Sequence, residues 1–268
     1  MPGMRIMLGS SVAAICLLSV SLQGAAGVLI VEKTTSSGTP STNQIQIESS
    51  RMRAETVGPR GEKQIVVFDG TRQVLMLIDE QNKSYTELTK TEADDLGAEM
   101  AKAMEQIKKQ LESLPPDQQK QLESMMQGRM GGAGGAARKT VYKRTGTDTV
   151  GKWPCTKYEG YDGETKTADL CTVDPKALGL TDADFAVTRQ FVEFFRRVVP
   201  AMADQAFAIG TVEQQGFAGV PVRRTRTVLG RQTTTEITDV SRQTFPDASY
   251  APPAGYQKRP FAAMGRAR

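Results

Sequence analysis

The segment IVVFDGTRQVLMLI, residues 65–78, decides the fold of this chain. Two apolar runs, Ile65–Phe68 and Val74–Ile78, flank the dipeptide Asp69-Gly70. Asp-Gly favours the backbone angles of a tight hairpin turn, so the segment predicts two antiparallel strands joined directly. The chain has 268 residues, of which 39% are hydrophobic, and this is enough to bury a substantial core.

Further strands are predicted on both sides of this hairpin. Polar and apolar residues alternate over Gln44–Glu48 and again at Met52 and Ala54, which is typical of a half-buried strand. The other pieces are a strand over Val28–Lys33, a Ser/Thr/Gly/Pro loop over Thr34–Thr42, turns at Gly58–Gly61 and Asp79–Lys83, and a strand over Ser84–Leu88. Because the connections are short, these strands form an antiparallel meander.

The pattern then becomes helical. The tetrapeptide TEAD at residues 91–94 resembles a capping box, and an apolar stripe follows at spacings of three and four for about six turns. Prolines at 115–116 end this helix, and a second helix runs to Met130. A glycine-rich linker over residues 131–137 follows. Residues 91–130 are therefore predicted to be a helical hairpin inserted into the sheet and covering it.

This hairpin is rich in methionine, at positions 100, 104, 125, 126 and 130. Methionine side chains conform to irregular shapes, so they serve either as core filler against the sheet or as an adaptable surface for a variable ligand or partner.

The second half of the chain adds strands and one well-defined helix. Asp162-Gly163 predicts a hairpin that joins Trp153–Gly160 to Glu164–Val173. Thr181 is the predicted N-cap of the helix, with Asp184 three residues later. Leu180 and Phe185 form its hydrophobic staple.

The remainder is predicted from weaker signals. A broad apolar helix face ends before Pro200, strands resume at 139–144 and over 209–245, and the chain from Pro252 is loosely ordered. We expect one domain over residues 28–257 and a disordered basic tail over 258–268.

Apart from Cys16 in the N-terminal segment, the chain has two cysteines, Cys155 and Cys171. They are predicted to form a disulfide, because the N-terminus indicates export to an oxidising compartment. The alternative is two buried free thiols. With a plain two-residue turn at Asp162-Gly163, Cys155 would lie opposite Leu170 and Cys171 would point to the other face. A disulfide across this hairpin therefore requires an odd-length loop or a β-bulge.

The N-terminus predicts export. Residues 1–27 carry Arg5, an apolar run from about Ile6 to Leu22 and then small residues, which is the pattern of a cleavable signal peptide. The processed protein should start at Gly27 or Val28 and be periplasmic, with secretion as the alternative. Ile15 precedes Cys16 where a lipoprotein signal requires a small residue, so lipidation is rejected. No later segment is apolar enough to span a membrane.

Composition excludes several kinds of site. The chain has no histidine, which removes Ser-His-Asp and Cys-His catalysis, and it contains no P-loop, G-x-S-x-G or dinucleotide motif. A net charge of +4 is too weak to indicate nucleic-acid binding. Arg224 and Arg226 share one face of a predicted strand and Arg223 takes the other, which we interpret as a solvated sheet face rather than an anion site. No metal, cofactor or catalytic residue is predicted, although a carboxylate pair is compatible with the sequence.

Several segments resemble a bacterial exported family, domain of unknown function 4412. They are Leu29–Lys33, Ser50–Glu55, Ile65–Gly70, Gln73–Tyr85, Trp153–Tyr161 and Cys171–Pro175. The family has no assigned catalytic residues. The resemblance implies an α+β fold similar to the lipoprotein-carrier (LolA-like) superfamily, which is an incomplete antiparallel β-barrel covered by helices.

Two functions follow from this resemblance as expectations. The first is a non-enzymatic binding protein for an apolar ligand, a lipid or a lipoprotein acyl chain. Its expected lining residues are Met100, Met104, Ile107, Phe191 and Phe195. The second is a cell-envelope module that binds another protein and fills the concavity with its own side chains.

Overall fold

The computed structural model describes residues 26–58, 61–113, 140–198, 216–228 and 230–261, together with Pro115 and Gln118. Residues 1–25 of the predicted signal peptide, most of the second hairpin helix, the glycine-rich linker and the end of the tail lie outside the described residues.

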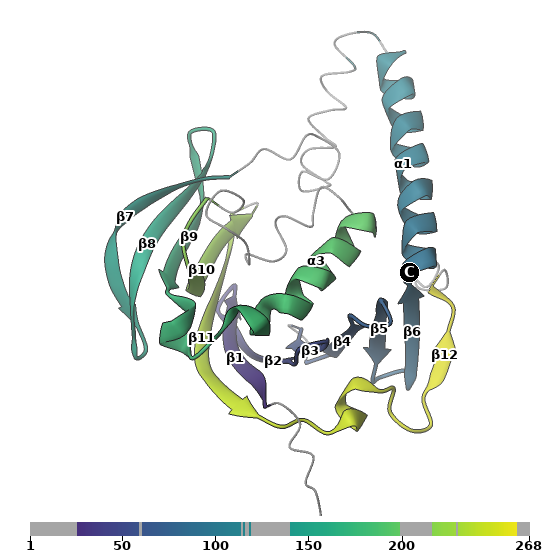
Figure 1. Cartoon of the computed structure of the whole chain (residues 1–268). Coiled ribbons are helices and arrows are strands. Elements are labelled where there is room, and N and C mark those ends of the chain that lie inside the picture. Colours follow the sequence, from purple (N-terminus) through teal and green to yellow (C-terminus); the bar gives the residue numbers. More distant parts are fainter. Residues whose placement is uncertain are drawn as a thin grey trace, which may run out of the picture.

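A single sheet of twelve strands dominates the described chain (Figure 1). Its order is β12-β6-β5-β4-β3-β2-β1-β11-β10-β9-β8-β7, so each half of the chain forms a meander and β1 joins the halves through β11. The strands are β1 Gly27–Ser36, β2 Thr39–Ile47, β3 Arg51–Val57, β4 Lys63–Asp69, β5 Val74–Asp79, β6 Ser84–Thr89, β7 Val141–Val150, β8 Trp153–Asp162, β9 Thr165–Val173, β10 Val220–Val228, β11 Arg231–Gln243 and β12 Gln257–Arg259.

The sheet curls but does not close. Its edge strands, β12 and β7, have no pairing with each other in the described residues, and only the β12–β6 pair is parallel. The predicted incomplete antiparallel barrel is therefore confirmed.

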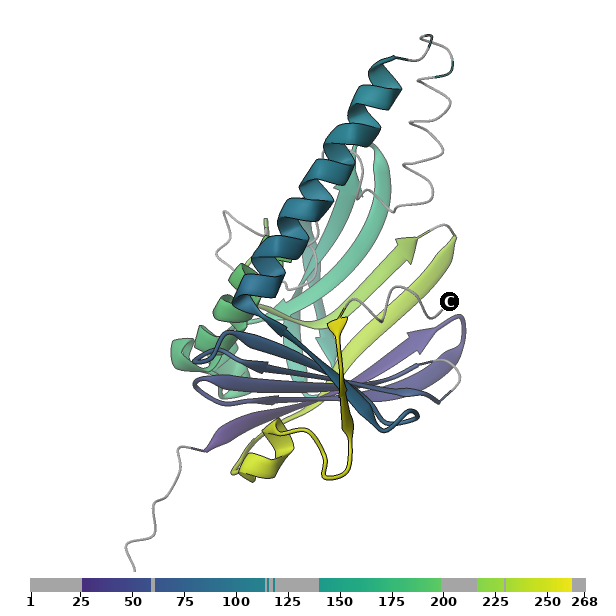
Figure 2. The same ribbon diagram turned by 90° about the vertical axis from the view of Figure 1, so that its right-hand side faces the viewer.

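In the part of the chain that the structure describes, two helices accompany the sheet: α1, Lys90–Glu112, and α3, Ala186–Val198. Short 3₁₀ turns lie at Pro175–Leu178, Asp182–Phe185 and Asp247–Tyr250. Figure 1 shows α3 inside the curve of the sheet, while both views show α1 rising from β6 and extending beyond the strands (Figure 2).

The predicted loop over Thr34–Thr42 is wrong. Its residues extend β1 and β2, which meet at a two-residue turn where Ser37 and Gly38 have φ of 49° and 85°. Two positive φ angles give the turn whose twist matches a hairpin. The β-branched threonines on either side pair across strands, for example Thr34 with Thr235 at 3.1 Å between hydroxyls.

The alternating segment predicted as one strand is two. The backbone N–H of Glu48 donates to the carbonyl of Arg51 at 2.8 Å, so the chain reverses between β2 and β3. Met52 then lies opposite Ile47. The alternation survives the turn because paired residues share a face of the sheet.

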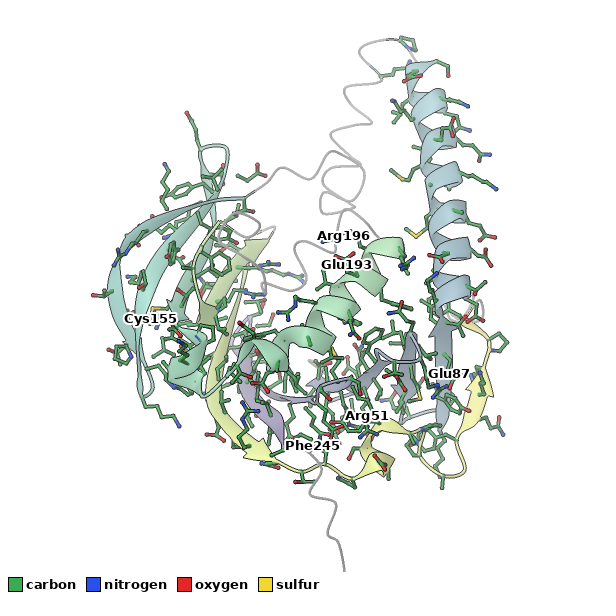
Figure 3. The ribbon with its side chains drawn as sticks, viewed as in Figure 1. Arg51, Glu87, Cys155, Glu193, Arg196 and Phe245 are labelled. Atoms are coloured by element: carbon green, nitrogen blue, oxygen red, sulfur yellow. A yellow bond between two sulfur atoms is a disulfide. The ribbon has the colours of Figure 1, made fainter. Side chains whose placement is uncertain are left out.

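The convex face is covered by the C-terminal segment. Phe245 and Tyr250 are buried against Ile65, Val67 and other convex-face residues. Figure 3 shows Phe245 and Arg51 on the side of the sheet opposite α3. The Arg51 guanidinium lies 4.4 Å from the Tyr250 ring centroid.

The prediction of a loosely ordered tail is wrong for its first part. Gln257–Arg259 pairs with β6 as β12, because the edge of β6 offers unpaired backbone groups. The predicted start of the tail, residue 258, lies inside this strand.

The disulfide is present, with Cα atoms 5.4 Å apart. The β8–β9 register shifts between Gly160 and Tyr161, and this bulge moves Cys171 onto the face of Cys155. The predicted disulfide is therefore confirmed, and of the two predicted ways to form it the structure has the bulge.

Candidate functional site

The candidate site is the concave face of the sheet, on the side of α3. Leu180 and Phe185 are buried just before this helix. Thr181 and Asp184 form the predicted capping box, but it caps the 3₁₀ turn Asp182–Phe185, and α3 begins after that turn. Arg242 of β11 donates to both carboxylate oxygens of Asp184 at 2.7 Å. Burial opposes ionisation of Asp184, but the hydrogen bonds from Arg242 and Thr181 outweigh it and lower the pKa of the carboxyl. The N-terminal end of α3 is therefore fixed to the sheet.

An aromatic cluster holds α3 against the strands. The ring of Phe68, on β4, lies 5.3 Å from that of Phe191 and 5.4 Å from that of Phe194. Phe68 is fully buried, and Phe194 is 1% exposed. Phe195 stacks on Phe191 at 6.1 Å and is half-buried. The aromatic surface thus continues from the core to the rim of the concave face.

The predicted lining residues fall into two groups. Phe191 and Phe195 are together on α3, beside the sheet. Met100, Met104 and Ile107 are on α1, where Met100 is 41% exposed and the other two are half-buried. The prediction that the first hairpin helix lies on the sheet is wrong: α1 packs on α3 and on β6, because α3 already occupies the apolar concave surface.

The two helices cross closely at Gly97. A Cβ at this position would lie 2.1 Å from the backbone carbonyl oxygen of Arg197. The Arg197 side chain also donates to Asp94 at 3.0 Å, and the hydrogen bonds from Arg197 and Lys90 lower the pKa of Asp94.

The N-cap of α1 is Thr89 rather than the predicted Thr91, and Glu92 completes the capping box.

This close crossing gives a testable prediction. Gly97→Val should lower the free energy of unfolding by about 1–3 kcal/mol, because the backbone of α3 would have to move away. Ala98→Val is the matched control, since Ala98 is exposed and the change there costs only the helix propensity of valine, about 0.5 kcal/mol. Urea denaturation measures both values. Equal losses of unfolding free energy in the two variants would contradict the close contact of α1 with α3 at Gly97.

The concave face continues past α3 into a polar region. Along β1, Glu32, Thr34 and Ser36 alternate on the same face as the core residues Val28 and Ile30. Thr34, Ser36, Thr39, Ser41 and Val57 line a recess of about 120 Å³. Asn43 donates to the Thr34 hydroxyl at 3.0 Å.

Arg224 belongs to this polar region. It pairs with Thr235, which pairs with Thr34, so register places it on the concave side. Burial and the neighbouring charge of Arg226 lower the pKa of Arg224, while burial raises the pKa of Glu32 against the attraction of Arg224. The prediction of a solvated arginine face is wrong, because the sheet curls around these side chains and leaves both arginines half-buried.

Comparison with known protein families identifies the family of this chain. Residues 90–256 match the family described as "Domain of unknown function (DUF4412)". The chain belongs to this family. The DUF4412 match begins at α1 and ends before β12, so the strands of the first meander precede it. No curated protein matches the chain.

Solved structures with a similar arrangement share little sequence. An uncharacterized conserved protein from Thermus thermophilus matches with a TM-score of 0.44 and 7% identity, over 88% of this chain and 91% of that chain. The complex of MucA and MucB from Pseudomonas aeruginosa gives a TM-score of 0.35 and 12% identity, over 84% of this chain and 56% of that chain. PNGF-II gives a TM-score of 0.38 and 8% identity, over 90% of this chain and 32% of that chain.

The described residues contain no group of three His, Cys, Asp or Glu side chains placed to hold a metal ion. Within the same part of the chain, no helix has the length and apolar character needed to cross a membrane. The disulfide fits an exported protein, because such bonds persist in oxidising compartments.

Proposed function

We propose that this protein is a non-enzymatic binding protein of the periplasm, and that its half-barrel binds an apolar ligand beneath α3. The ligand would be a lipid or the acyl chain of a lipoprotein. The observation that carries this proposal is the aromatic surface from buried Phe191 to half-buried Phe195, which leads from the rim into the core. Apolar walls with few polar groups are typical of ligand sites.

The contacts that hold α3 would allow the helix to move away from the sheet and admit a ligand. Its N-terminal side is fixed by Arg242 and Asp184, and its C-terminal side contacts α1 through Arg197 and Asp94. Between these ends the cluster of Phe68, Phe191 and Phe194 joins the helix to the sheet. An acyl chain inserted at Phe195 would separate some of these side chains from each other, but each would then contact the acyl chain. The loss of apolar contact would therefore be small. The predicted α1 residues Met100, Met104 and Ile107 would extend this lining.

A second candidate is a module that binds an envelope protein. It is favoured by the same aromatic cluster, since Phe68 and Phe194 fill the concave face without any ligand. In that case the protein partner would bind elsewhere on the surface.

Native mass spectrometry of the processed protein, purified from the envelope fraction, tests the proposal. We expect bound lipid, and Phe195→Ser should retain clearly less of it because the rim of the lining becomes polar. Glu193→Ser is the matched control on the exposed face of α3. A lipid-free mass that persists after incubation with envelope lipids would refute the apolar-ligand proposal and favour the protein partner.

A further inference from the structure

The concave polar region contains a half-buried arginine, Arg224, that makes no hydrogen bond and no ion pair within the described residues. Its guanidinium is attracted electrostatically by Glu32 and Tyr142. A guanidinium carries five N–H donors and stays charged in proteins. Removing such a charge from water without a partner is costly, so this arrangement has a reason other than stability.

Arg226 adds a second positive charge on the same face. Residues two apart on a strand are about 7 Å apart and point the same way. The mutual repulsion of the two guanidinium groups is one cause of the lowered pKa of Arg224. Glu32 attracts Arg224 electrostatically, while burial raises the pKa of the Glu32 carboxyl. Two arginines on one half-buried face of a strand match the oxygens of a phosphate or carboxylate.

Hydroxyl groups complete this surface. Arg224 lies beside Thr235, and Arg226 beside Thr233. The Thr233 hydroxyl lies 3.1 Å from that of Ser36, which lines the recess with Thr34. Each hydroxyl offers one donor and two acceptor sites, so those already paired across strands retain capacity for a ligand.

We propose that Arg224 and Arg226 bind an oxyanion, the phosphate or carboxylate head of the ligand, at the polar end of the concave face. This inference rests on the proposed function, because the same ligand would place its apolar chain under α3. The protein would then select anionic amphiphiles over neutral or zwitterionic ones with the same chains.

Isothermal titration of the processed protein with three probes tests this. They are dihexanoyl phosphatidic acid, dihexanoyl phosphatidylcholine and inorganic phosphate. Phosphatidic acid should bind about tenfold or more tightly than phosphatidylcholine, and Arg224→Gln should remove about that factor, as expected for a charged hydrogen-bonded contact. Arg226→Gln should weaken the same probe. Both changes should weaken phosphatidylcholine less, because the choline cation offsets the single charge of its phosphodiester.

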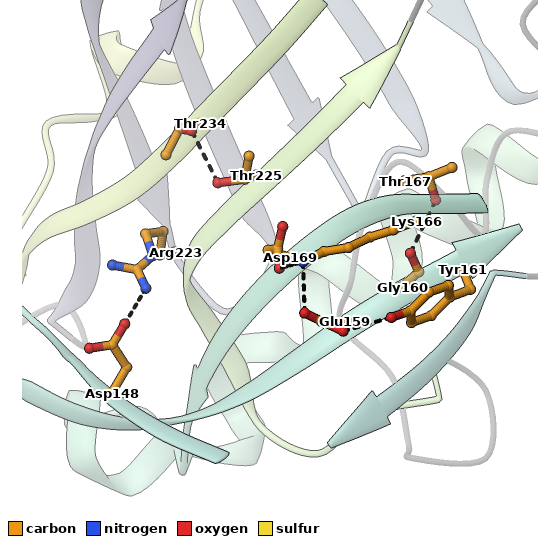
Figure 4. A network of polar contacts seen from close by, with 10 residues as sticks. All are labelled: Asp148, Glu159, Gly160, Tyr161, Lys166, Thr167, Asp169, Arg223, Thr225 and Thr234. Atoms are coloured by element: carbon orange, nitrogen blue, oxygen red, sulfur yellow. Dashed lines mark hydrogen bonds and ion pairs between the residues drawn. The ribbon is translucent and has the colours of Figure 1, made fainter. Parts of the chain in front are cut away.

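Two controls separate a binding role from a structural one. Arg231→Gln removes an equal charge at the exposed β10–β11 turn, and Arg223→Gln removes one on the opposite face of β10, where Arg223 pairs with Asp148 (Figure 4). Both should bind phosphatidic acid like the unmodified protein. Thermal unfolding of Arg224→Gln should occur at the same temperature or higher, because an unpaired charge is lost.

The outcomes distinguish the two proposals. Equal binding of the two lipids, or undiminished binding of phosphatidic acid by Arg224→Gln, overturns the oxyanion site and leaves the lipid proposal standing. Binding of inorganic phosphate alone, lost in Arg224→Gln, supports the site and contradicts the lipid proposal. Absence of binding for all three probes overturns the oxyanion site.

Discussion

Phe194→Ala is expected to lower the free energy of unfolding by about 3–5 kcal/mol, which is the usual cost of truncating a buried aromatic side chain. Phe194 is 1% exposed and lies 5.4 Å from Phe68, at the centre of the contact between α3 and the sheet. The loss combines the lost burial of the ring with the cavity left behind. Urea denaturation followed through the single tryptophan, Trp153, gives the value.

Phe195→Ala is the matched control for this variant. Phe195 is on the same helix but is half-buried, so its truncation removes less contact and leaves a site open to water. We expect less than half the loss of Phe194→Ala. Equal losses in the two variants would contradict the assignment of Phe194 to the core and Phe195 to the rim.

Replacing both cysteines, Cys155→Ala with Cys171→Ala, is expected to cost about 3 kcal/mol. The bond closes a loop of 16 residues, and constraining a loop of this size in the unfolded chain gives that magnitude in the chain-entropy model. Cys171 is fully buried, so the pair also packs in the core. Guanidinium denaturation of the oxidised protein and the double variant measures the difference.

Thiol titration provides the independent check on this bond. The denatured, non-reduced processed protein should show no free thiol. Two reactive thiols in protein folded under oxidising conditions would contradict the bond, and an unchanged free energy of unfolding in the double variant would contradict its role in stability.

Local signals predicted much of the fold. Asp69-Gly70 and Asp162-Gly163 mark the positions of two hairpins, which are present. Neither pair forms the centre of a two-residue turn, because Asp69 pairs with Val74 and Asp162 with Thr165. The capping box of Thr181 and Asp184 is likewise local. The disulfide required an odd-length loop or a bulge to bring the two cysteines to one face, and the β8–β9 pair has the bulge.

The sequence predictions were wrong where residues far apart in the chain determine the local structure. Thr34–Thr42 is polar and looked like a loop, but its first residues pair with β11, which lies some 200 residues away in the sequence. The continuous apolar runs of Ile65–Phe68 and Val74–Ile78 indicate strands covered on both faces. That signal could have predicted that the C-terminal segment packs on the sheet.

The candidate site was predicted only in part. The apolar spacing predicted that Phe191 and Phe195 share a helix face, and they lie together on α3. Their role as ligand lining stays a prediction. The same spacing on α1 did not show that this helix extends past the sheet. The prediction that Arg224 and Arg226 share one face of a strand is confirmed. Their burial depends on how the whole sheet curls, and the alternation of residues along one strand does not predict that curl.

Hydrogen exchange of α3 tests the central claim most directly. We propose that an apolar ligand inserts between this helix and the sheet. Addition of dihexanoyl phosphatidic acid should therefore slow amide exchange in Ala186–Val198, while exchange in the strands Lys63–Asp69 and Val74–Asp79 stays the same. Exchange in α3 that is as slow as in those strands, and unaltered by the lipid at saturating concentration, would contradict the claim.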